Sequence, residues 1–218
     1  MYRRFLKRMI DFLLALVGTM VLLPVFLVFA VVIYVDDPGP ILFKQKRVGK
    51  DKEIFWMHKF RSMKVATPDI PTHLLSDPQQ YITKVGKLIR KTSIDELPQL
   101  FDILAGKMSI IGPRPALWNQ DDLIAEREKY GANDVRPGLT GWAQINGRDE
   151  LPIPVKARFD GEYIQALNSG SWAAFCMDCK CFFGTVISVL KSDGVVEGGT
   201  GELNKQEEKK AETEAITK

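Results

Sequence analysis

The chain has 218 residues, of which 45% are hydrophobic and 26% charged, a composition that suits one globular domain with an additional segment. The formal net charge of +3 and the sequence pI of about 8.7 are too weakly basic to indicate a nucleic-acid-binding protein. The odd number and tight clustering of Cys176, Cys179 and Cys181 argue against a disulfide framework. These residues fit small apolar positions of a helix better than a zinc site.

An uncharged apolar run from Phe12 to Tyr34 is long enough to span a bilayer. Pro24 lies in its middle, removes one helical hydrogen bond and predicts a kink or a break. Basic residues, which favour the cytoplasmic side of a membrane, flank both ends of the run: Arg3, Arg4, Lys7 and Arg8 before it, and Lys44, Lys46, Arg47 and Lys50 after it. The residues alone leave two topologies open, a single kinked span and a hairpin that enters and leaves on one side.

Residues 37–197 have the composition of a soluble domain in which strands and helices alternate with polar loops. Strands are predicted within residues 40–49 and 53–63, and helices within 81–91, 121–130, 158–168 and 171–190. Residues 67–78 and the glycine-rich stretch 135–152 are predicted to be loops. The last helix has a broad apolar face that suits either the core or a membrane surface. Residues 198–218 are highly charged with few apolar side chains, which predicts a disordered tail.

Two adjacent carboxylates, Asp95 and Glu96, precede an apolar helical pattern that Gly106 is expected to end. Ser93 and Glu96 fit a capping box, while a cap at Asp95 would place Pro98 inside the first helical turn. Taken alone, this stretch favours helix capping over catalysis.

Basic side chains recur on predicted turns and loops along the soluble domain. They are Lys59 and Arg61, Arg90 and Lys91, Arg114 between two prolines, Arg136, and Arg148. Each one alone suits a surface ion pair, but together they favour a phosphate-binding site, because the guanidinium fork matches phosphate oxygens. Glycines near Arg136 and Arg148 are expected to let the backbone approach a ligand. Since Asp95 and Glu96 would repel a polyphosphate, the pattern also predicts Mg²⁺.

Three stretches together resemble the bacterial sugar transferase family, the monotopic phosphoglycosyl transferases. They are HKFRSM at residues 58–63, SIDELPQLFDILAGKMSIIGPRP at residues 93–115 and VRPGLTGWAQINGR at residues 135–148. The resemblance extends to about Val196 and implies an α+β fold. Residues 1–36 would form a re-entrant membrane helix–break–helix, broken at Pro24. Residues 37–197 would form a small cytosolic catalytic domain, mainly helical, with short strands and interfacial helices.

The resemblance also implies a reaction, the first membrane step of glycoconjugate assembly. Such enzymes transfer a sugar-1-phosphate from a UDP-sugar to undecaprenyl phosphate and release UMP, using Mg²⁺ at the cytoplasmic face of the bacterial inner membrane. The expected partners are therefore the UDP-sugar, undecaprenyl phosphate, membrane lipid and downstream glycosyltransferases, and no nucleic acid.

By the same resemblance, Asp95 is expected to be the nucleophile and a magnesium ligand, with Glu96 as its partner carboxylate or base. The expected phosphate-binding residues are Lys59, Arg90 and Arg114, and the residues expected near the nucleotide end are Arg136, Gln144 and Arg148. The chain departs from the family pattern at Leu23, where many relatives have a serine before the anchor proline. Either Thr19 or a neighbour is then expected to bond the carbonyls that Pro24 frees, or the break is expected to have a different angle.

Two other functions remain open from the sequence. A membrane-bound phosphohydrolase of nucleotide sugars would use the same carboxylates with water as the acceptor, and would need no polyprenyl phosphate. A catalytically silent anchor that recruits glycosylation enzymes would suit the charged tail, although the carboxylates and arginines argue against it.

Overall fold

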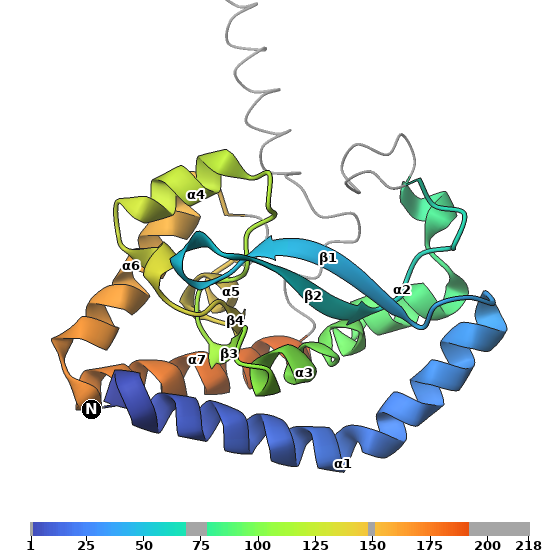
Figure 1. Ribbon diagram of the computed structural model, residues 1–218, viewed down its shortest axis with the longest axis horizontal. Helices are drawn as coiled ribbons and strands as arrows, with labels where there is room; N and C mark the ends of the chain where they lie inside the picture. Colours follow the sequence, from blue (N-terminus) through green and yellow to red (C-terminus); the bar gives the residue numbers. More distant parts are fainter. Residues whose placement is uncertain (1, 69–77, 148–150, 192–218) are drawn as a thin grey trace, which may run out of the picture.

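The computed structural model describes residues 2–68, 78–147 and 151–191, with a long N-terminal helix lying along a small body of helices and strands (Figure 1). The mixture of helices and short strands confirms the predicted α+β class. The predicted tail at residues 198–218 and most of the predicted loop at residues 67–78 lie outside the described residues.

Helix α1 (Lys7–Asp36) follows a short π-helical turn, η1 (Tyr2–Leu6), and continues through Pro24. Figure 1 shows that its axis changes direction partway along, so that its two arms form an open V beside the body of the protein. The predicted break is therefore a bend in a continuous helix. A bend suffices because a proline inside a helix removes one hydrogen bond and crowds one carbonyl without disrupting the turns on either side.

The hydroxyl of Thr19 does not replace the hydrogen bond that Pro24 removes. Thr19 Oγ1 donates to the carbonyl of Ala15 at 2.7 Å. The carbonyl that loses its donor lies four residues before the proline, at Met20. The expectation for Thr19 itself is therefore wrong, because a threonine in a helix bonds the carbonyl one turn before it.

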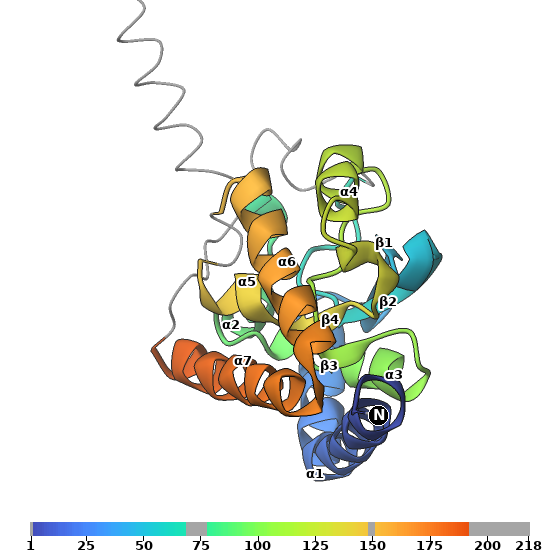
Figure 2. The same ribbon diagram turned by 90° about the vertical axis from the view of Figure 1, so that its left-hand side faces the viewer.

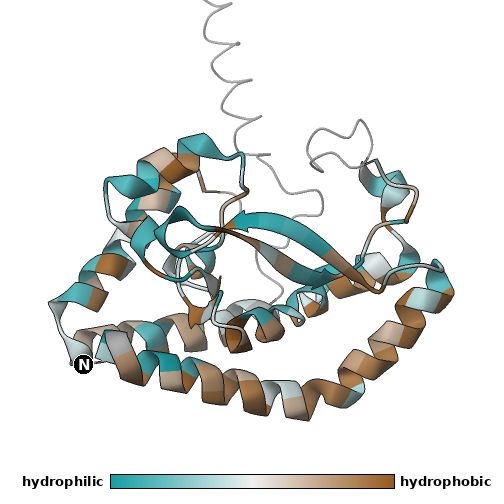
Figure 3. Cartoon of the chain, in the orientation of Figure 1, coloured by the Kyte–Doolittle hydropathy of each residue, from teal (hydrophilic) through white to brown (hydrophobic). Residues whose placement is uncertain are grey.

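The surface of α1 is mostly apolar and uncovered. In the described part of the chain, α1 is the one helix that is both long and apolar enough to cross a membrane, with a mean hydropathy of 2.9 and only 11% of its most apolar stretch buried. Figure 3 shows the contrast between this apolar helix and the mainly hydrophilic strand β1. The core helix of a soluble protein would be mostly buried, so α1 indicates that the chain associates with a membrane.

Strands β1 (Leu42–Val48) and β2 (Ile54–Phe60) form an antiparallel hairpin joined by a short 3₁₀ turn, η2 (Lys50–Lys52). Side chains alternate between the two faces of such a pair. Phe55 and Met57 are buried on one face, whereas Trp56 is exposed on the other. Because Lys59 follows the same alternation as Phe55 and Met57, it lies on the inner face of the hairpin.

Helix α2 (Lys84–Lys91), the 3₁₀ turn η5 (Ile94–Glu96) and helix α3 (Gln99–Leu104) pack between the hairpin and α1. Aromatic contacts join the three layers: the ring of Phe26 in α1 lies 5.7 Å from that of Phe60 and 5.3 Å from that of Phe101. The main core therefore lies beneath the turn that carries the two adjacent carboxylates.

Strands β3 (Ser109–Ile111) and β4 (Gly138–Thr140) form a short parallel pair, and helix α5 (Trp142–Ile145) follows β4. The sequence predicted a loop here, because its glycines obscure the strand pattern. A Cβ atom on Gly138 would lie 2.2 Å from the backbone nitrogen of Gly112. The glycine at 138 thus permits two backbone segments to touch, while the expected approach of this backbone to a ligand stays a prediction.

Helices α4 (Asp121–Glu128), α6 (Ile153–Ser169) and α7 (Ser171–Lys191) complete the body, with the turns η4 (Pro78–Tyr81) and η6 (Ala132–Asp134) between earlier elements. Figure 2 shows α6 standing beside α4 and α5, with α7 crossing next to the first turns of α1. Cys181 is buried in this second core, and Cys176 and Cys179 are half-buried on the same helix.

Candidate active site

Lys59, Asp95, Glu96 and Arg114 come together at the junction of β2, η5 and the loop after β3. Lys59 Nζ lies 2.8 Å from Glu96 Oε1 and 3.9 Å from Asp95 Oδ2. Arg114 NH2 lies 2.7 Å from Glu96 Oε1, and its NH1 group donates to Glu96 Oε2 at 3.4 Å. Residues that are far apart in the sequence therefore meet as the sequence predicted.

The local chain path at the two carboxylates differs from the expected helix cap. Ser93 has a left-handed backbone (φ 55°), which ends the approach from α2, and Ile94–Glu96 then form a 3₁₀ turn. Neither Ser93 nor Pro98 caps the helix that follows through a side chain, and α3 begins only at Gln99. Asp95 thus lies one turn before α3 and is not its N-cap. The physical reason is that Pro98 already has helical angles at the position before α3.

Glu96 is the carboxylate of the pair whose negative charge is balanced by two cations. It is buried, and it accepts hydrogen bonds from both Lys59 and Arg114. Burial alone would raise the pKa of Glu96, but the charges and hydrogen bonds of Arg114 and Lys59 hold that pKa well below its usual value. Glu96 is therefore ionised and committed to orienting the two cations.

Asp95 is the uncommitted member of the pair. None of the described residues donates a hydrogen bond to its carboxylate, although the side chain is only 12% exposed. Burial raises the pKa of Asp95 and the charge of Glu96 raises it further, while Lys59, Arg90 and Arg114 oppose that rise. An ionised carboxylate with little solvation and no hydrogen bond is a better nucleophile than one already bonded to donors.

The loop that carries Arg114 is held rigidly, as its flanking prolines predicted. The three consecutive carbonyls of Pro113, Arg114 and Pro115 accept hydrogen bonds from the Gly138 N–H at 2.8 Å, from Arg127 NH1 at 2.9 Å and from Arg47 NH1 at 2.9 Å. With no carbonyl left to shift partners, the loop presents the Arg114 fork in one orientation. The sequence did not indicate Arg127 and Arg47 as supports, because their partners are backbone atoms.

Arg90 approaches the pair from the end of α2. Its Nε group donates to Ser62 Oγ at 2.7 Å, and its charge lowers the pKa of Asp95. Helix α2 reaches this position because Gly86 packs directly on the backbone of Ser62, where a Cβ atom would lie 1.9 Å from the Ser62 carbonyl oxygen. The structure therefore brings all three predicted phosphate-binding cations, Lys59, Arg90 and Arg114, to the same two carboxylates.

Asp102 is a positioning residue that the sequence analysis missed. Its Oδ2 atom accepts the backbone N–H of His58 at 2.9 Å, and its Oδ1 atom lies 2.7 Å from His58 Nδ1. Asp102 thus ties α3 to the strand residue that precedes Lys59, and so fixes Lys59 relative to Glu96. Burial raises the pKa of Asp102, and its hydrogen bonds to His58 lower it. The available signal was a carboxylate among the apolar positions of a predicted helix.

The donor chemistry at Asp95 suits a magnesium ion that is shared with a substrate. Within the described part of the chain, no three His, Cys, Asp or Glu side chains gather to hold a metal by protein ligands alone. Mg²⁺ in phosphate-handling sites is commonly held by one or two carboxylates together with phosphate oxygens and water. Asp95 has both oxygens available for such a role, whereas Glu96 is bonded to Lys59 and Arg114.

The residues expected at the nucleotide end have three different placements. Arg136 donates to the carbonyl of Gly106 and lines a separate cavity, whose lining does not include Asp95 or Glu96. Gln144 lies in α5, and its buried amide has no hydrogen-bond partner among the described residues. Arg148 lies outside the described residues. The assignment of these three residues to the nucleotide end stays a prediction.

Arg61, which the sequence grouped with Lys59, has a structural contact instead. It is buried, and it donates to the backbone carbonyl of Asp37 and pairs with the Asp37 carboxylate at 3.3 Å. In a continuous strand, residues 59 and 61 would point to the same face, because side chains alternate between the two faces. Strand β2 ends at Phe60, so Arg61 does not follow this alternation. Arg61 therefore fastens the end of α1 to the hairpin.

The chain is similar to known proteins over nearly its whole length. The family described as "Bacterial sugar transferase" matches residues 2–192. The "Uncharacterized sugar transferase EpsL" of Bacillus subtilis is 39% identical over 191 residues, which cover 87% of this chain and 90% of that protein.

Two longer relatives have names that state a reaction. The UDP-glucose:undecaprenyl-phosphate glucose-1-phosphate transferase of Escherichia coli is 38% identical over 196 residues, 84% of this chain and 40% of that protein. The UDP-N-acetylgalactosamine-undecaprenyl-phosphate N-acetylgalactosaminephosphotransferase of Aeromonas hydrophila is 37% identical over 196 residues, 87% of this chain and 45% of that protein. The chain thus spans less than half the length of these two relatives.

Proposed function

Because the chain belongs to the bacterial sugar transferase family, we propose that it transfers a sugar-1-phosphate from a UDP-sugar to undecaprenyl phosphate and releases UMP. The names of the relatives from Escherichia coli and Aeromonas hydrophila support this class of reaction. In this chain, the observation that carries the proposal is the division of labour between the two carboxylates: Glu96 binds two cations, and Asp95 accepts no hydrogen bond from the described residues.

The chemistry that suits this arrangement has two displacements at one phosphorus. In the first, a carboxylate oxygen of Asp95 bonds to the β-phosphorus of the UDP-sugar, and the bond from that phosphorus to the bridging oxygen breaks, so that UMP leaves with the electron pair. In the second, an oxygen of undecaprenyl phosphate bonds to the same phosphorus and the Asp95 carboxylate leaves. The product is the undecaprenyl-diphospho-sugar, and Asp95 is regenerated.

The cations of the site have complementary roles in this scheme. Lys59 and Arg114 hold Glu96 and are themselves held by it, so they meet the donor already oriented. Arg90, anchored to Ser62, stabilises the charge of Asp95 from the other side. Glu96 is proposed to keep these cations in place and to act as a partner carboxylate, because its own low pKa makes it a weak base.

We propose that Mg²⁺ is bound by Asp95 together with phosphate oxygens of the donor. When bound, the ion supplies positive charge that neutralises the diphosphate. The protein contributes the carboxylate, the surrounding cations, and the buried floor formed by the core beneath η5.

The membrane topology is proposed to be re-entrant, with both ends of α1 at the cytoplasmic face of the bacterial inner membrane. The bend at Pro24 and the basic residues on both flanks support this topology. Single cysteines at Phe5 and at Lys50, each compared with the parent chain, should both resist an impermeant thiol reagent added outside intact cells. Labelling at Phe5→Cys alone would indicate a true span.

The reaction is tested by incubating the purified full-length chain with Mg²⁺, polyprenyl phosphate and a panel of UDP-sugars. The expected result is UMP release that depends on the lipid acceptor, together with a lipid-linked sugar diphosphate. Repeated turnover without the lipid would indicate a phosphohydrolase. Absence of UMP and of lipid-linked product with every UDP-sugar would favour the catalytically silent anchor.

A further inference from the structure

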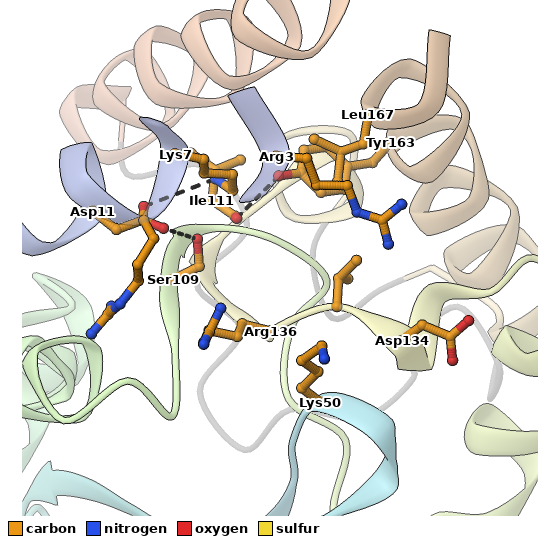
Figure 4. A pocket seen from close by; sticks show the side chains of 12 residues that line it. Arg3, Lys7, Asp11, Lys50, Ser109, Ile111, Asp134, Arg136, Tyr163 and Leu167 are labelled. Atoms are coloured by element: carbon orange, nitrogen blue, oxygen red, sulfur yellow. Dashed lines mark hydrogen bonds and ion pairs between the residues drawn. The ribbon is translucent and has the colours of Figure 1, made fainter. Parts of the chain in front are cut away.

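A cavity of about 470 Å³ lies at the polar beginning of α1, and its lining does not include Asp95 or Glu96. Its walls come from the first turns of the chain, β3, the loop before β4, and α6 (Figure 4). Basic side chains predominate over acidic ones in its lining: Arg3, Lys7, Arg8, Lys50 and Arg136 against Asp11 and Asp134. The surplus of positive charge makes the cavity a candidate for an anionic ligand.

Asp11, one of the two acidic residues that line this cavity, is already bonded. Asp11 is buried and accepts hydrogen bonds from Ser109 Oγ at 2.6 Å and from the backbone N–H of Ile110 at 3.1 Å. Lys7 pairs with Asp178 at 2.9 Å and lies 3.9 Å from Asp11. These contacts build the back of the cavity, and Lys50 pairs with Asp51, a residue outside the cavity lining, at 2.8 Å.

Three arginines around the cavity are held by neutral acceptors. Arg3 NH1 donates to Asn168 Oδ1 at 2.5 Å, and Arg136 Nε donates to the carbonyl of Gly106 at 2.8 Å. Arg8 donates to two backbone carbonyls at the end of α3, at 2.7 Å and 3.2 Å. None of the three has a carboxylate within 4.0 Å among residues 2–68, 78–147 and 151–191.

Such an arrangement has an energetic consequence. Arg8 and Arg136 both bond to the same chain segment, residues 103–106, so two like charges lie close together, and only the more distant Asp11 partly offsets that of Arg8. Neutral hydrogen bonds fix the direction of a guanidinium group but do not cancel its charge. In Figure 4 the side chains of Arg3 and Lys7 enter the cavity opposite those of Arg136 and Lys50, so a bound anion would be surrounded.

We propose that this cavity binds a phosphate group, and that it is a site separate from the reaction centre. A phosphate offers several strong acceptor oxygens, which suit several guanidinium forks better than a single carboxylate does. The cavity lies at the start of α1, where its basic side chains stand beside the exposed apolar side chains of Phe5, Leu6 and Met9. This position matches the depth of lipid headgroups, so the phosphate could come from an anionic membrane lipid or from a soluble phosphate.

The first arm of the test measures lipid retention. Native mass spectrometry of the full-length chain, released from a neutral detergent with added phosphatidylglycerol or phosphatidylcholine, should show preferential retention of phosphatidylglycerol. Arg3→Gln combined with Arg136→Gln should weaken that retention at least roughly tenfold, because charge-assisted hydrogen bonds are lost. The control is Arg158→Gln, which removes one positive charge, against two in the cavity variant, from an exposed position on α6 outside the cavity.

The second arm measures thermal stabilisation by inorganic phosphate at constant ionic strength. Since the proposed reaction centre is also expected to bind phosphate, the quantity of interest is the difference in phosphate-dependent Tm increase between the parent chain and the cavity variant. Loss of lipid retention alone in Arg3→Gln/Arg136→Gln indicates a lipid phosphate, and loss of the phosphate-dependent Tm increase indicates a soluble one. If the cavity variant binds both probes as the parent does, or if Arg158→Gln loses them equally, the proposed site is wrong.

Discussion

Two buried contacts between carboxylates and arginines in this protein differ in how their charges are matched. At the packing of α4 against α6, Arg127 and Asp160 form a single pair, with Nε and NH2 at 2.7 Å and 2.6 Å from the same carboxylate oxygen. At the junction of α2 and α3, Lys59 and Arg114 both bond to Glu96, and Asp95 beside it accepts no hydrogen bond from the described residues.

The difference separates a contact that serves the fold from one that suits chemistry. A buried pair whose two charges satisfy each other gives no group to a ligand, and removing either partner leaves an uncompensated charge. A buried carboxylate without hydrogen bonds lowers the stability of the fold, and proteins retain such groups where function requires them. The α4–α6 pair is thus structural, and the α2–α3 junction has the properties of a reaction centre.

The two contacts are also connected. Arg127 NH1 donates to the backbone carbonyl of Arg114 at 2.9 Å, so the matched pair supports the loop that holds Glu96. Changes at the structural pair should therefore act mainly on stability and more weakly on the reaction, through the orientation of Arg114.

The largest expected effect is that of Asp95→Asn on turnover. Asparagine keeps the shape of the side chain but removes the nucleophilic charge, so transfer should fall by at least about 10⁴-fold, the scale seen when an enzyme loses its nucleophile. Because burial raises the pKa of Asp95, its ionised form destabilises the folded state at neutral pH. The variant should therefore have a Tm equal to or above that of the parent, and wild-type turnover would remove Asp95 from the mechanism.

The next effect is on stability and distinguishes the neighbouring carboxylates. Glu96→Gln leaves Lys59 and Arg114 without their counter-charge, and should reduce the free energy of unfolding by about 3 kcal/mol. Asp160→Asn should cost a similar amount, about 3 kcal/mol, because Arg127 stays buried. Denaturant titrations of both variants beside Asp95→Asn check the ordering, and a destabilised Asp95→Asn with an unaffected Glu96→Gln would reverse it.

A smaller effect is expected from Arg114→Lys. Lysine keeps the positive charge but loses the fork that bonds to both oxygens of Glu96. We expect kcat/KM to fall roughly 10- to 100-fold, the loss of one or two charge-assisted hydrogen bonds. Lys107→Arg, a conservative exchange at a residue that does not bond to Asp95 or Glu96, serves as the control. Equal kcat/KM for Arg114→Lys and the parent would return Arg114 to a surface role.

The smallest effect is on pH dependence. Since burial raises the pKa of Asp95, the acid limb of kcat/KM should lie above the usual aspartate value of about 3.9. The charge of Arg90 lowers the pKa of Asp95, so Arg90→Gln should raise that pKa. The acid limb of kcat/KM should then move to higher pH, because the carboxylate of the variant stays protonated to a higher pH. A limb that moves to lower pH in Arg90→Gln would show that the titrating group is not Asp95.

The sequence predicted which charged residues meet better than it predicted the chain path around them. Asp95, Glu96 and Arg114 were singled out by the resemblance of their stretch to the family, since the residues alone favoured helix capping. The 3₁₀ turn at Ile94–Glu96 and the later start of α3 were not predicted, since a capping box and a tight turn use the same residue types.

Other errors have a common physical origin, contacts between segments that are distant in sequence. The parallel pairing of β3 with β4 depends on Gly112 and Gly138 meeting without side chains, which no local pattern reports. Likewise Asp102 bonds to His58, forty-four residues earlier, and Arg127 bonds to Arg114 through a backbone oxygen. Local periodicity predicts elements, but it does not specify which distant atoms a buried polar group will meet.

The central claim is that Asp95 carries the phosphosugar between two substrates, and it is tested most directly by trapping that species. The purified enzyme, mixed rapidly with Mg²⁺ and a labelled UDP-sugar in the absence of lipid, should acquire protein-bound label and release about one equivalent of UMP per active site. Addition of polyprenyl phosphate should then transfer the label to lipid. Asp95→Asn should acquire none, while Glu96→Gln, where folded, should still be labelled more slowly. A parent enzyme that transfers sugar phosphate to lipid at full rate without ever acquiring label, or an Asp95→Asn protein labelled like the parent, would contradict the account.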